Sequence, residues 1–152
     1  MRSATMEHTE QLERCIEDCQ GCHSICLQTI NHCLDKGGRH TEAQHIRLLQ
    51  DCVQICQTGA DFMIRGSDRH GLTCFVCSEV CDACAGDCEQ FQGDQQMQAC
   101  AEMCRTCSTS CREMAETMGV TGEDSFEGGG GVDYGEAFEE VAEGIMKESR
   151  SG

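Results

Sequence analysis

Five cysteines follow one another between residues 74 and 88 at spacings of three, four, three and four: Cys74, Cys77, Cys81, Cys84 and Cys88. This spacing has the 3.5-residue repeat of a helical stripe that faces a partner helix. The pattern therefore predicts one helix that projects all five thiols from one side. Positions that a coiled coil fills with Leu and Ile hold sulfur here.

The same spacing recurs in three other segments: Cys15, Cys19, Cys22 and Cys26 with Cys33 one heptad later, then Cys52 and Cys56, then Cys100, Cys104, Cys107 and Cys111. The four stripes contain all sixteen cysteines of the chain. Short connections between such repeats place sequential helices antiparallel. We therefore expect an all-α fold, an antiparallel up-and-down four-helix bundle with a Cys-lined core, plus a Gly-rich C-terminal tail.

Capping residues and glycines set the expected helix boundaries. The first helix should begin after Ser3 or Thr5 and end near Leu34, before Gly37 and Gly38. A capping box of Thr41 and Gln44 opens the second, which reaches about Arg65. Ser67 or Asp68 caps the third, which extends to Phe91, and Asp94 caps the fourth, which stops at Gly119.

The composition changes after residue 118. Residues 1–118 should form the metal-binding bundle, and residues 119–134, with glycine at 128–131 among acidic residues, a flexible linker. In residues 135–152 the apolar side chains recur at helical spacing, at Phe138, Val141, Ala142, Ile145 and Met146. This short amphipathic helix either folds back on its own bundle or frays, or it docks on another protein.

A second, outer stripe of the first helix consists of Ile16, Leu27, Ile30 and Leu34. It is explained equally well by packing against a neighbouring helix and by a contact between subunits.

Composition excludes several classes of protein. A formal charge of −16 argues against nucleic acid as a partner. The segment 1–14 is polar and no apolar stretch approaches about 18 residues, so we expect neither export nor a membrane span, and a cytoplasmic location. Sixteen cysteines in a reducing compartment indicate metal binding before they indicate disulfides. With five Phe, one Tyr and no Trp, metal is the obvious filler of the core.

Spacing then favours one metal among those that thiolates select, which are Cu(I), Zn(II) and iron–sulfur clusters. Structural zinc prefers C-x-x-C pairs on turns, and bacterial iron–sulfur runs lie in loops that end in Cys-Pro, whereas this chain has no proline. Cu(I) accepts two or three thiolates, and neighbours at i,i+3 or i,i+4 supply them from a single helix. Cu(I) sites can therefore repeat along the bundle.

The number of thiols favours a store of multiple Cu(I) ions over an enzyme. Sixteen thiolates would bind eight ions at two per ion without sharing, and more once sulfurs bridge. A transfer chaperone needs only one or two exposed sites. Two alternatives stay open on this reasoning: an iron–sulfur or other electron-transfer protein, and a scavenger of zinc or of thiolate-binding metals in general.

The stripes Cys15 to Cys26 and Cys100 to Cys111, with the longer run Cys74 to Cys88, resemble those of the cysteine-rich four-helix-bundle copper storage proteins. The resemblance covers residues 8–118. It implies Cu(I) held by cysteines in a tetramer, a cytosolic store for members without an export signal, and ions that enter through one end of the bundle lined with His or Met. The second helix departs from the fullest pattern, because it has only two cysteines.

The register indicates which end is the mouth. An antiparallel bundle brings His8, Met63, His70, Met114 and Met118 to one end, all on inner stripes. The other end collects Cys33, His45, Leu49, Phe91 and Met97, and should be more apolar and better plugged. We therefore expect metal to enter at the first end through exchangeable imidazole and thioether ligands. The remaining histidines, His23, His32 and His40, are expected at the surface.

Overall fold

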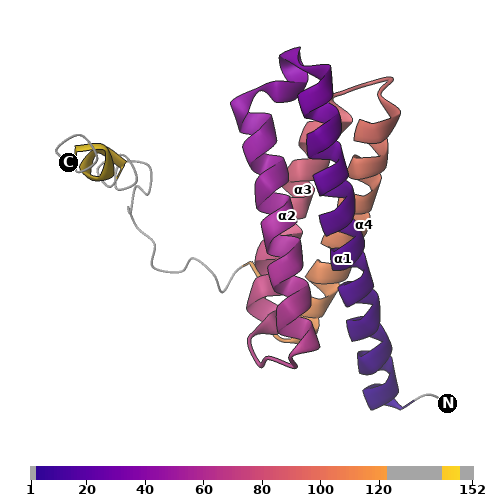
Figure 1. The fold of residues 1–152 in the computed structure, drawn as a ribbon. Helices are drawn as coiled ribbons and strands as arrows, with labels where there is room; N and C mark the ends of the chain where they lie inside the picture. Colours follow the sequence, from indigo (N-terminus) through magenta and orange to yellow (C-terminus); the bar gives the residue numbers. More distant parts are fainter. Residues whose placement is uncertain (1–2, 123–141, 148–152) are drawn as a thin grey trace. The chain divides into compact units, whose positions relative to one another are not determined.

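The computed structural model describes residues 3–122 and 142–147. Four long helices account for most of the first range: α1 (Ala4–Lys36), α2 (Ala43–Ile64), α3 (His70–Glu89) and α4 (Gln95–Thr117). A short 3₁₀ helix, η1 (Gly38–Thr41), lies between α1 and α2. Figure 1 shows the four helices side by side in a bundle, as the cysteine stripes predict.

Each helix packs on the next along the chain, and α4 returns to pack on α1. Because the connections are short, successive helices run in opposite directions (Figure 1). One end of the bundle therefore holds the end of α2 and the starts of α1 and α3, and we call it the His70 end. The opposite end, at the start of α2, is the His45 end.

The boundaries of α1 and α4 follow the sequence-based expectation closely. Ser3 caps α1 by accepting a hydrogen bond from the Met6 amide (3.2 Å), and Asp94 caps α4 in the same way through the Met97 amide (3.2 Å). Gly37, with φ of 70°, donates its amide to the Cys33 carbonyl and ends α1, two residues later than expected.

Two predicted caps are wrong. The Thr41 hydroxyl donates to the Gly38 carbonyl (2.9 Å) inside η1, so it does not form a capping box, and α2 begins after Glu42 without a side-chain cap. Ser67 accepts from the Arg69 amide (3.1 Å) in the turn before α3, which begins only at His70. In both places the hydroxyl is used by the tight turn that precedes the helix.

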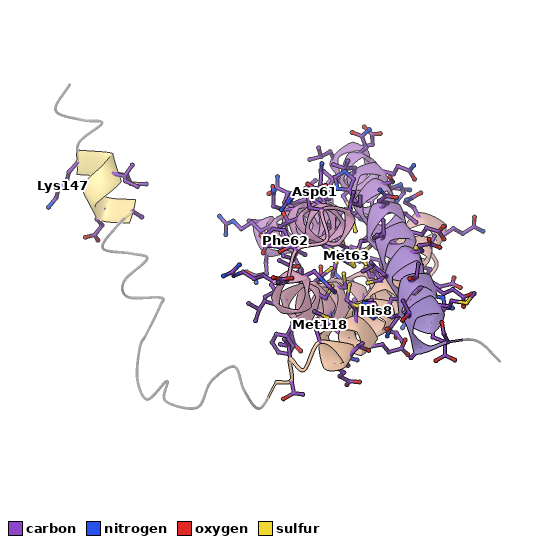
Figure 2. All side chains as sticks on the ribbon, turned by 90° about the horizontal axis from the view of Figure 1, so that it is seen from below. His8, Asp61, Phe62, Met63, Met118 and Lys147 are labelled. Atoms are coloured by element: carbon purple, nitrogen blue, oxygen red, sulfur yellow. The ribbon has the colours of Figure 1, made fainter. Side chains whose placement is uncertain are left out.

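The core of the bundle is built from small side chains. All sixteen cysteines are buried, none more than 1 % exposed, and Figure 2 shows their sulfur atoms gathered inside the ring of helices. Larger apolar side chains close the two ends, with Met63 and Met114 at one end and Leu49, Met97 and Phe91 at the other. Thiols thus occupy the length of the bundle between two apolar layers.

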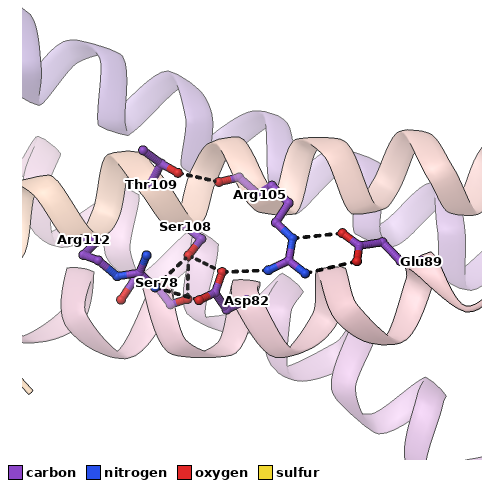
Figure 3. A network of polar contacts seen from close by, with 7 residues as sticks. All are labelled: Ser78, Asp82, Glu89, Arg105, Ser108, Thr109 and Arg112. Carbon is purple, nitrogen blue, oxygen red and sulfur yellow. Dashed lines mark hydrogen bonds and ion pairs between the residues drawn. The ribbon is translucent and has the colours of Figure 1, made fainter.

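Polar contacts join α3 and α4 on the outside of the bundle. Arg105 donates to both carboxylate oxygens of Glu89 and to Asp82, and Ser108 donates to Asp82 as well (Figure 3). Burial works to raise the pKa of Asp82, but hydrogen bonds from Arg112 and Ser108 outweigh it and lower that pKa. The ion-paired side chains of Arg105, Arg112, Asp82 and Glu89 are about half exposed, so these ion pairs contribute little to stability.

Contacts divide the chain into one unit over residues 1–122 and another over 123–152. Residues 119–122, the start of the predicted linker, belong to the first unit, where Val120 donates its amide to the Ala115 carbonyl (2.8 Å) and packs against the core. In the second unit residues 142–147 are helical, and residues 123–141 and 148–152 of the predicted linker and tail helix lie outside the described residues. Of the helices that the structure describes, none has both the length and the apolar character that crossing a lipid bilayer requires.

Candidate metal centre

The structure places all sixteen predicted cysteine ligands in the interior, and every one is a free thiol. Helices α1 and α3 each supply five, α4 supplies four and α2 supplies two. On α2 the inner positions that lack cysteine hold His45, Leu49, Gly59 and Met63. A Cβ atom at Gly59 would lie 3.9 Å from the Cys19 Sγ, so this position borders the sulfur core without adding to it.

Neighbouring sulfur atoms form a continuous series along the bundle axis. Near the His70 end, the Cys111 Sγ lies 3.7 Å from that of Cys15 and 3.5 Å from that of Cys19. In the middle, the Cys22 Sγ lies 3.7 Å from those of Cys52 and Cys104. A disulfide needs a sulfur–sulfur distance of about 2.05 Å, so these contacts are between separate thiols.

Several sulfur atoms converge in groups of three or four, within 4.8 Å of one another: Cys15, Cys74 and Cys111; Cys19, Cys77, Cys107 and Cys111; Cys56, Cys77, Cys81 and Cys107; Cys22, Cys52, Cys56 and Cys81; Cys22, Cys26, Cys52 and Cys104. Adjacent groups share members, and each of these groups draws on more than one helix. Metal ions bound in neighbouring groups would therefore be bridged by common sulfurs.

The sulfur separations suit a small soft cation. Metal–sulfur bonds of about 2.3 Å in a trigonal set put the sulfurs about 4.0 Å apart. Contacts in the core already range from 3.5 Å for Cys19 and Cys111 to 4.0 Å for Cys56 and Cys107. The bundle can thus accept such ions with small movements of side chains.

Burial in a core of low polarity disfavours thiolates until a cation arrives. Burial raises the pKa of Cys33 to about 11, and the nearby carboxylate of Asp94 adds to the effect. A hydrogen bond with Cys111 works to lower the pKa of Cys74, but Cys15 and burial outweigh it and raise that pKa to about 12. At neutral pH these two thiols therefore keep their protons in the metal-free protein.

The five residues expected at the mouth all lie at the His70 end, with different exposure. Met63, His70 and Met114 are buried, and His8 is half-buried. Figure 2 labels His8, Met63 and Met118 at this end. Met118 does not continue the inner stripe as expected, because it follows the last residue of α4 and is 37 % exposed. It packs over the first turn of α3, where a Cβ at Gly71 would come within 2.7 Å of the Met118 Cβ.

His70 carries a free donor atom into this end of the core. Its Nδ1 donates to the Ser67 carbonyl (2.7 Å), which fixes the proton on that nitrogen and leaves a lone pair on Nε2. Among the described residues, Nε2 is a buried atom without a hydrogen-bond partner. An unsatisfied buried acceptor costs about 1–3 kcal/mol, so it calls for a ligand. Next to it along α3, the Cys74 thiol contacts the Met63 sulfur at 3.7 Å.

At the His45 end the donor atoms are already paired. The His45 Nε2 lies 3.3 Å from the Cys33 Sγ, which is also 3.6 Å from the Met97 sulfur, and His45 Nδ1 is bonded to Asp87. The expectation of an apolar plug is therefore only partly correct: Leu49, Met97 and Phe91 do bury this end, but they enclose a polar network.

The histidines expected at the surface are partly buried instead. His32 and His40 both contact the same oxygen of Asp94, at 2.8 and 2.9 Å, and His23 contacts the Val53 carbonyl. Burial works to raise the pKa of Asp94, but the hydrogen bonds from the two imidazoles hold it well below its usual range. No sequence spacing relates His32, His40 and Asp94, because they come from three separate elements: α1, η1 and the capping position of α4.

A profile of the copper storage protein family matches residues 8–116 of the chain. The match includes α2 and α3 in full, all but the ends of α1 and α4, and every cysteine.

Solved structures agree with this match. The protein Nmul_A1745 of Nitrosospira multiformis is 45 % identical, with a TM-score of 0.68 over 72 % of this chain and 98 % of that one. The Cu(I)-bound copper storage protein BsCsp3 of Bacillus subtilis is 33 % identical, with a TM-score of 0.65 over 69 % and 98 %. A cytosolic copper storage protein of Streptomyces lividans, with five coppers, is 28 % identical, with a TM-score of 0.63 over 72 % and 95 %.

Proposed function

Since the chain belongs to the copper storage protein family, we propose that it stores or buffers multiple Cu(I) ions on the thiolates of its core and is not an enzyme. All sixteen cysteines are the proposed ligands. The observation that carries the proposal is the continuous series of buried free thiols, with successive sulfur groups that share members. Such an array offers many equivalent sites for a soft cation, as a store requires.

Charge balance in the core sets the proton stoichiometry. Each Cu(I) ion brings one positive charge, and each thiolate one negative charge, into an interior closed to solvent. Binding every ion by two unshared thiolates would leave one buried negative charge per ion, which is costly in a medium of low dielectric. We therefore expect bridging sulfurs, and the release of about one proton for each ion bound.

Anaerobic titration of the reduced protein tests the store. In competition with a Cu(I) chelator, the protein should retain at least eight equivalents, the number that sixteen thiolates hold at two per ion. Four equivalents or fewer, with zinc bound preferentially, would refute the proposal and favour a zinc or general thiolate scavenger. A coloured, iron-containing preparation would favour the electron-transfer alternative.

A matched pair of variants locates the copper. The quadruple replacement of Cys22, Cys52, Cys81 and Cys104 by Ser removes four thiols that meet in the middle of the bundle. Replacement of Ser24, Ser108 and Ser110 by Ala changes hydroxyl groups and no thiol. Capacity should fall by several equivalents in the first variant and stay constant in the second. Equal capacity in both would place copper outside the proposed core.

Copper is proposed to enter at the His70 end, through His8, Met63, His70, Met114 and Met118. The unpaired Nε2 of His70 supports this choice, because it can bind an ion without first giving up a hydrogen bond. Beside it, the contact between the Met63 sulfur and the Cys74 thiol offers the next step inward. The ion would pass from imidazole and thioether donors to thiolates that hold it more tightly.

The setting of the store is also a proposal. A cytosolic location follows the description of the Streptomyces relative. A homo-oligomer, a tetramer by resemblance, is supported by the outer face of α1, where Leu27 and Leu34 are 48 % and 59 % exposed. Light scattering on the Leu27→Glu, Leu34→Glu variant, which should dissociate, tests that interface. For the 135–152 segment a protein partner stays a prediction, supported by Ile145 at 63 % exposure.

A further inference from the structure

Three donor atoms meet beside the His45 end, outside the thiol core. The Nε2 atoms of His32 and His40 lie 2.8 and 2.9 Å from one oxygen, Oδ2, of Asp94. The three residues come from α1, η1 and the cap of α4, so 62 positions of sequence separate the first from the last. We propose that His32, His40 and Asp94 form a binding site for one divalent transition-metal ion of the Zn²⁺ type, separate from the copper store.

Each donor is held in place before any ion binds. The second oxygen of Asp94, Oδ1, accepts the Met97 amide at 3.2 Å, which fixes the carboxylate. The ring of His40 packs on Phe91 with 4.4 Å between centroids. The ring of His32 meets the His40 ring edge-on, with 5.7 Å between centroids. An ion would therefore bind without ordering long, flexible side chains.

The distances need only a small adjustment. Bonds of about 2.05 Å to a tetrahedral ion separate its ligand atoms by about 3.3 Å, so each contact must open by about half an ångström.

A carboxylate can only accept hydrogen bonds, so both Nε2 atoms carry protons in the metal-free protein. Binding replaces these two protons, which move to Nδ1 or leave to solvent.

The donor set separates this site from the copper store. Two imidazoles and a carboxylate, without sulfur, suit Zn²⁺ and similar divalent ions, whereas Cu(I) prefers thiolates. Side-chain exposures of 25 % for His32, 20 % for His40 and 14 % for Asp94 leave the site open to an ion and to a water as fourth ligand.

The surrounding charges act in both directions. A formal charge of −16 for the whole chain attracts cations. Lys36 lines the hollow next to His32 and Asp94, and the Arg39 guanidinium lies 4.8 Å from the centroid of the Phe91 ring on which His40 packs. These two cations weaken binding and so favour a site that exchanges its ion with solution.

The test uses the full chain, loaded anaerobically with Cu(I) so that the thiols are occupied, and titrates Zn²⁺ against a chromophoric chelator. In the variant His32→Gln, His40→Gln the amide can still donate to Asp94, so the local hydrogen bonds survive while the imidazoles are lost. The control is His23→Gln, on α1 outside the cluster. Wild type and control should bind one Zn²⁺, and the double variant should bind it more than about 100-fold more weakly. Losing a residue that only hydrogen-bonds a metal ligand already lowers affinity by up to about 100-fold, and this variant loses two ligands.

A second measurement identifies the ligands even if copper loading fails. Co²⁺ added to metal-free protein should give, at one equivalent, weak visible bands without thiolate-to-metal charge transfer, and these bands should vanish in the double variant. Thiolate bands at the first equivalent, no Zn²⁺ bound by wild type, or equal binding by all three proteins would overturn the site. Copper capacity, measured on the same samples, reports on the store separately.

Discussion

The two ends of the bundle use the same kinds of residue in opposite states. At the His70 end the imidazole has one nitrogen bonded to a carbonyl and the other buried without a partner. At the His45 end both nitrogens of the imidazole are engaged, one by Asp87 and one by Cys33. Residue type alone therefore does not tell a mouth from a plug. What distinguishes the two ends is whether an imidazole nitrogen is free, and the proposed entry at the His70 end rests on that difference.

The two ends also differ in how completely their side chains are buried. Leu49, Met97 and Phe91 seal the His45 end, and its polar atoms satisfy one another beneath that seal. At the His70 end Met63 and Met114 are buried as well, but Met118 is 37 % exposed and His8 is half-buried, so two of the proposed entry residues reach solvent. We propose on this basis that the His45 end contributes stability and the His70 end contributes access, and the following predictions test that division.

The largest expected difference is in the stability of the metal-free protein. Leu49→Ala removes a fully buried side chain at the sealed end and should cost about 3 kcal/mol of unfolding free energy. Met118→Ala, at the His70 end, should cost less than about 0.5 kcal/mol, because that side chain is already partly in water. Chemical denaturation under reducing conditions measures both. Equal losses would show that the His70 end is sealed as firmly as the other.

The rate of Cu(I) uptake should depend on the His70 end more than on the His45 end, the reverse of the order expected for stability. The variant His8→Ala, Met63→Leu, His70→Leu removes three donors and should slow Cu(I) uptake at least about tenfold, a change of about 1.4 kcal/mol in the barrier. Capacity should stay unchanged, because every thiol remains. Stopped-flow transfer from a Cu(I) chelator measures the rate.

The matched control for that experiment is His45→Leu, Met97→Leu, which removes donors at the sealed end. It should leave the uptake rate within about twofold of wild type. Slower uptake in the control than in the triple variant would move the mouth to the His45 end.

Much of this architecture is already visible in the sequence. The 3.5-residue spacing places Cys15, Cys52, Cys77 and Cys104 inside, because the same physical condition, one face turned to partner helices, governs each stripe. The caps at Ser3 and Asp94 are local hydrogen bonds within three residues, so the sequence contains them in full.

The sequence does not show which of several possible hydrogen-bond partners a side chain takes once the helices have packed. Thr41 looks like a cap but bonds within η1, and His40 looks exposed but lies on Phe91 and Asp94. The free Nε2 of His70 depends on a carbonyl in the preceding turn, which no residue type signals. These features decide the chemistry of both ends, and they arise only after the helices pack.

The raised pKa values of Cys33 and Cys74 predict that these two thiols weaken the metal-free fold in alkali. The unfolded chain loses thiol protons from about pH 9.0, while burial holds the pKa of Cys33 at about 11 in the folded state. In that window the folded state binds more protons than the unfolded state, so stability falls as pH rises from about 9 to 11. The pKa of Cys74, about 12, extends the fall at the His70 end to higher pH.

Single replacements separate the two thiols. In thermal melts across the alkaline range, Cys33→Ser should flatten the decline up to about pH 11, and Cys74→Ser should flatten it up to about pH 12. The copper-loaded protein should behave in the reverse way and weaken in acid, because protons compete with Cu(I) for thiolates. An alkaline decline that neither variant alters would assign it to other groups.

The smallest difference concerns the two helix caps, one at each end. Ser3 and Asp94 accept the same kind of bond, both at 3.2 Å, but Asp94 also holds His32 and His40. Asp94→Ala should therefore cost about 2 kcal/mol and Ser3→Ala about 0.5 kcal/mol, the upper and lower limits for a cap. Asp94→Asn keeps the cap but replaces the charged acceptor of the two imidazoles. Its melting temperature should therefore lie between those of the Ser3→Ala and Asp94→Ala variants. If Ser3→Ala and Asp94→Ala were equally destabilising, the contacts of Asp94 with the two imidazoles would add nothing to the stability of the His45 end.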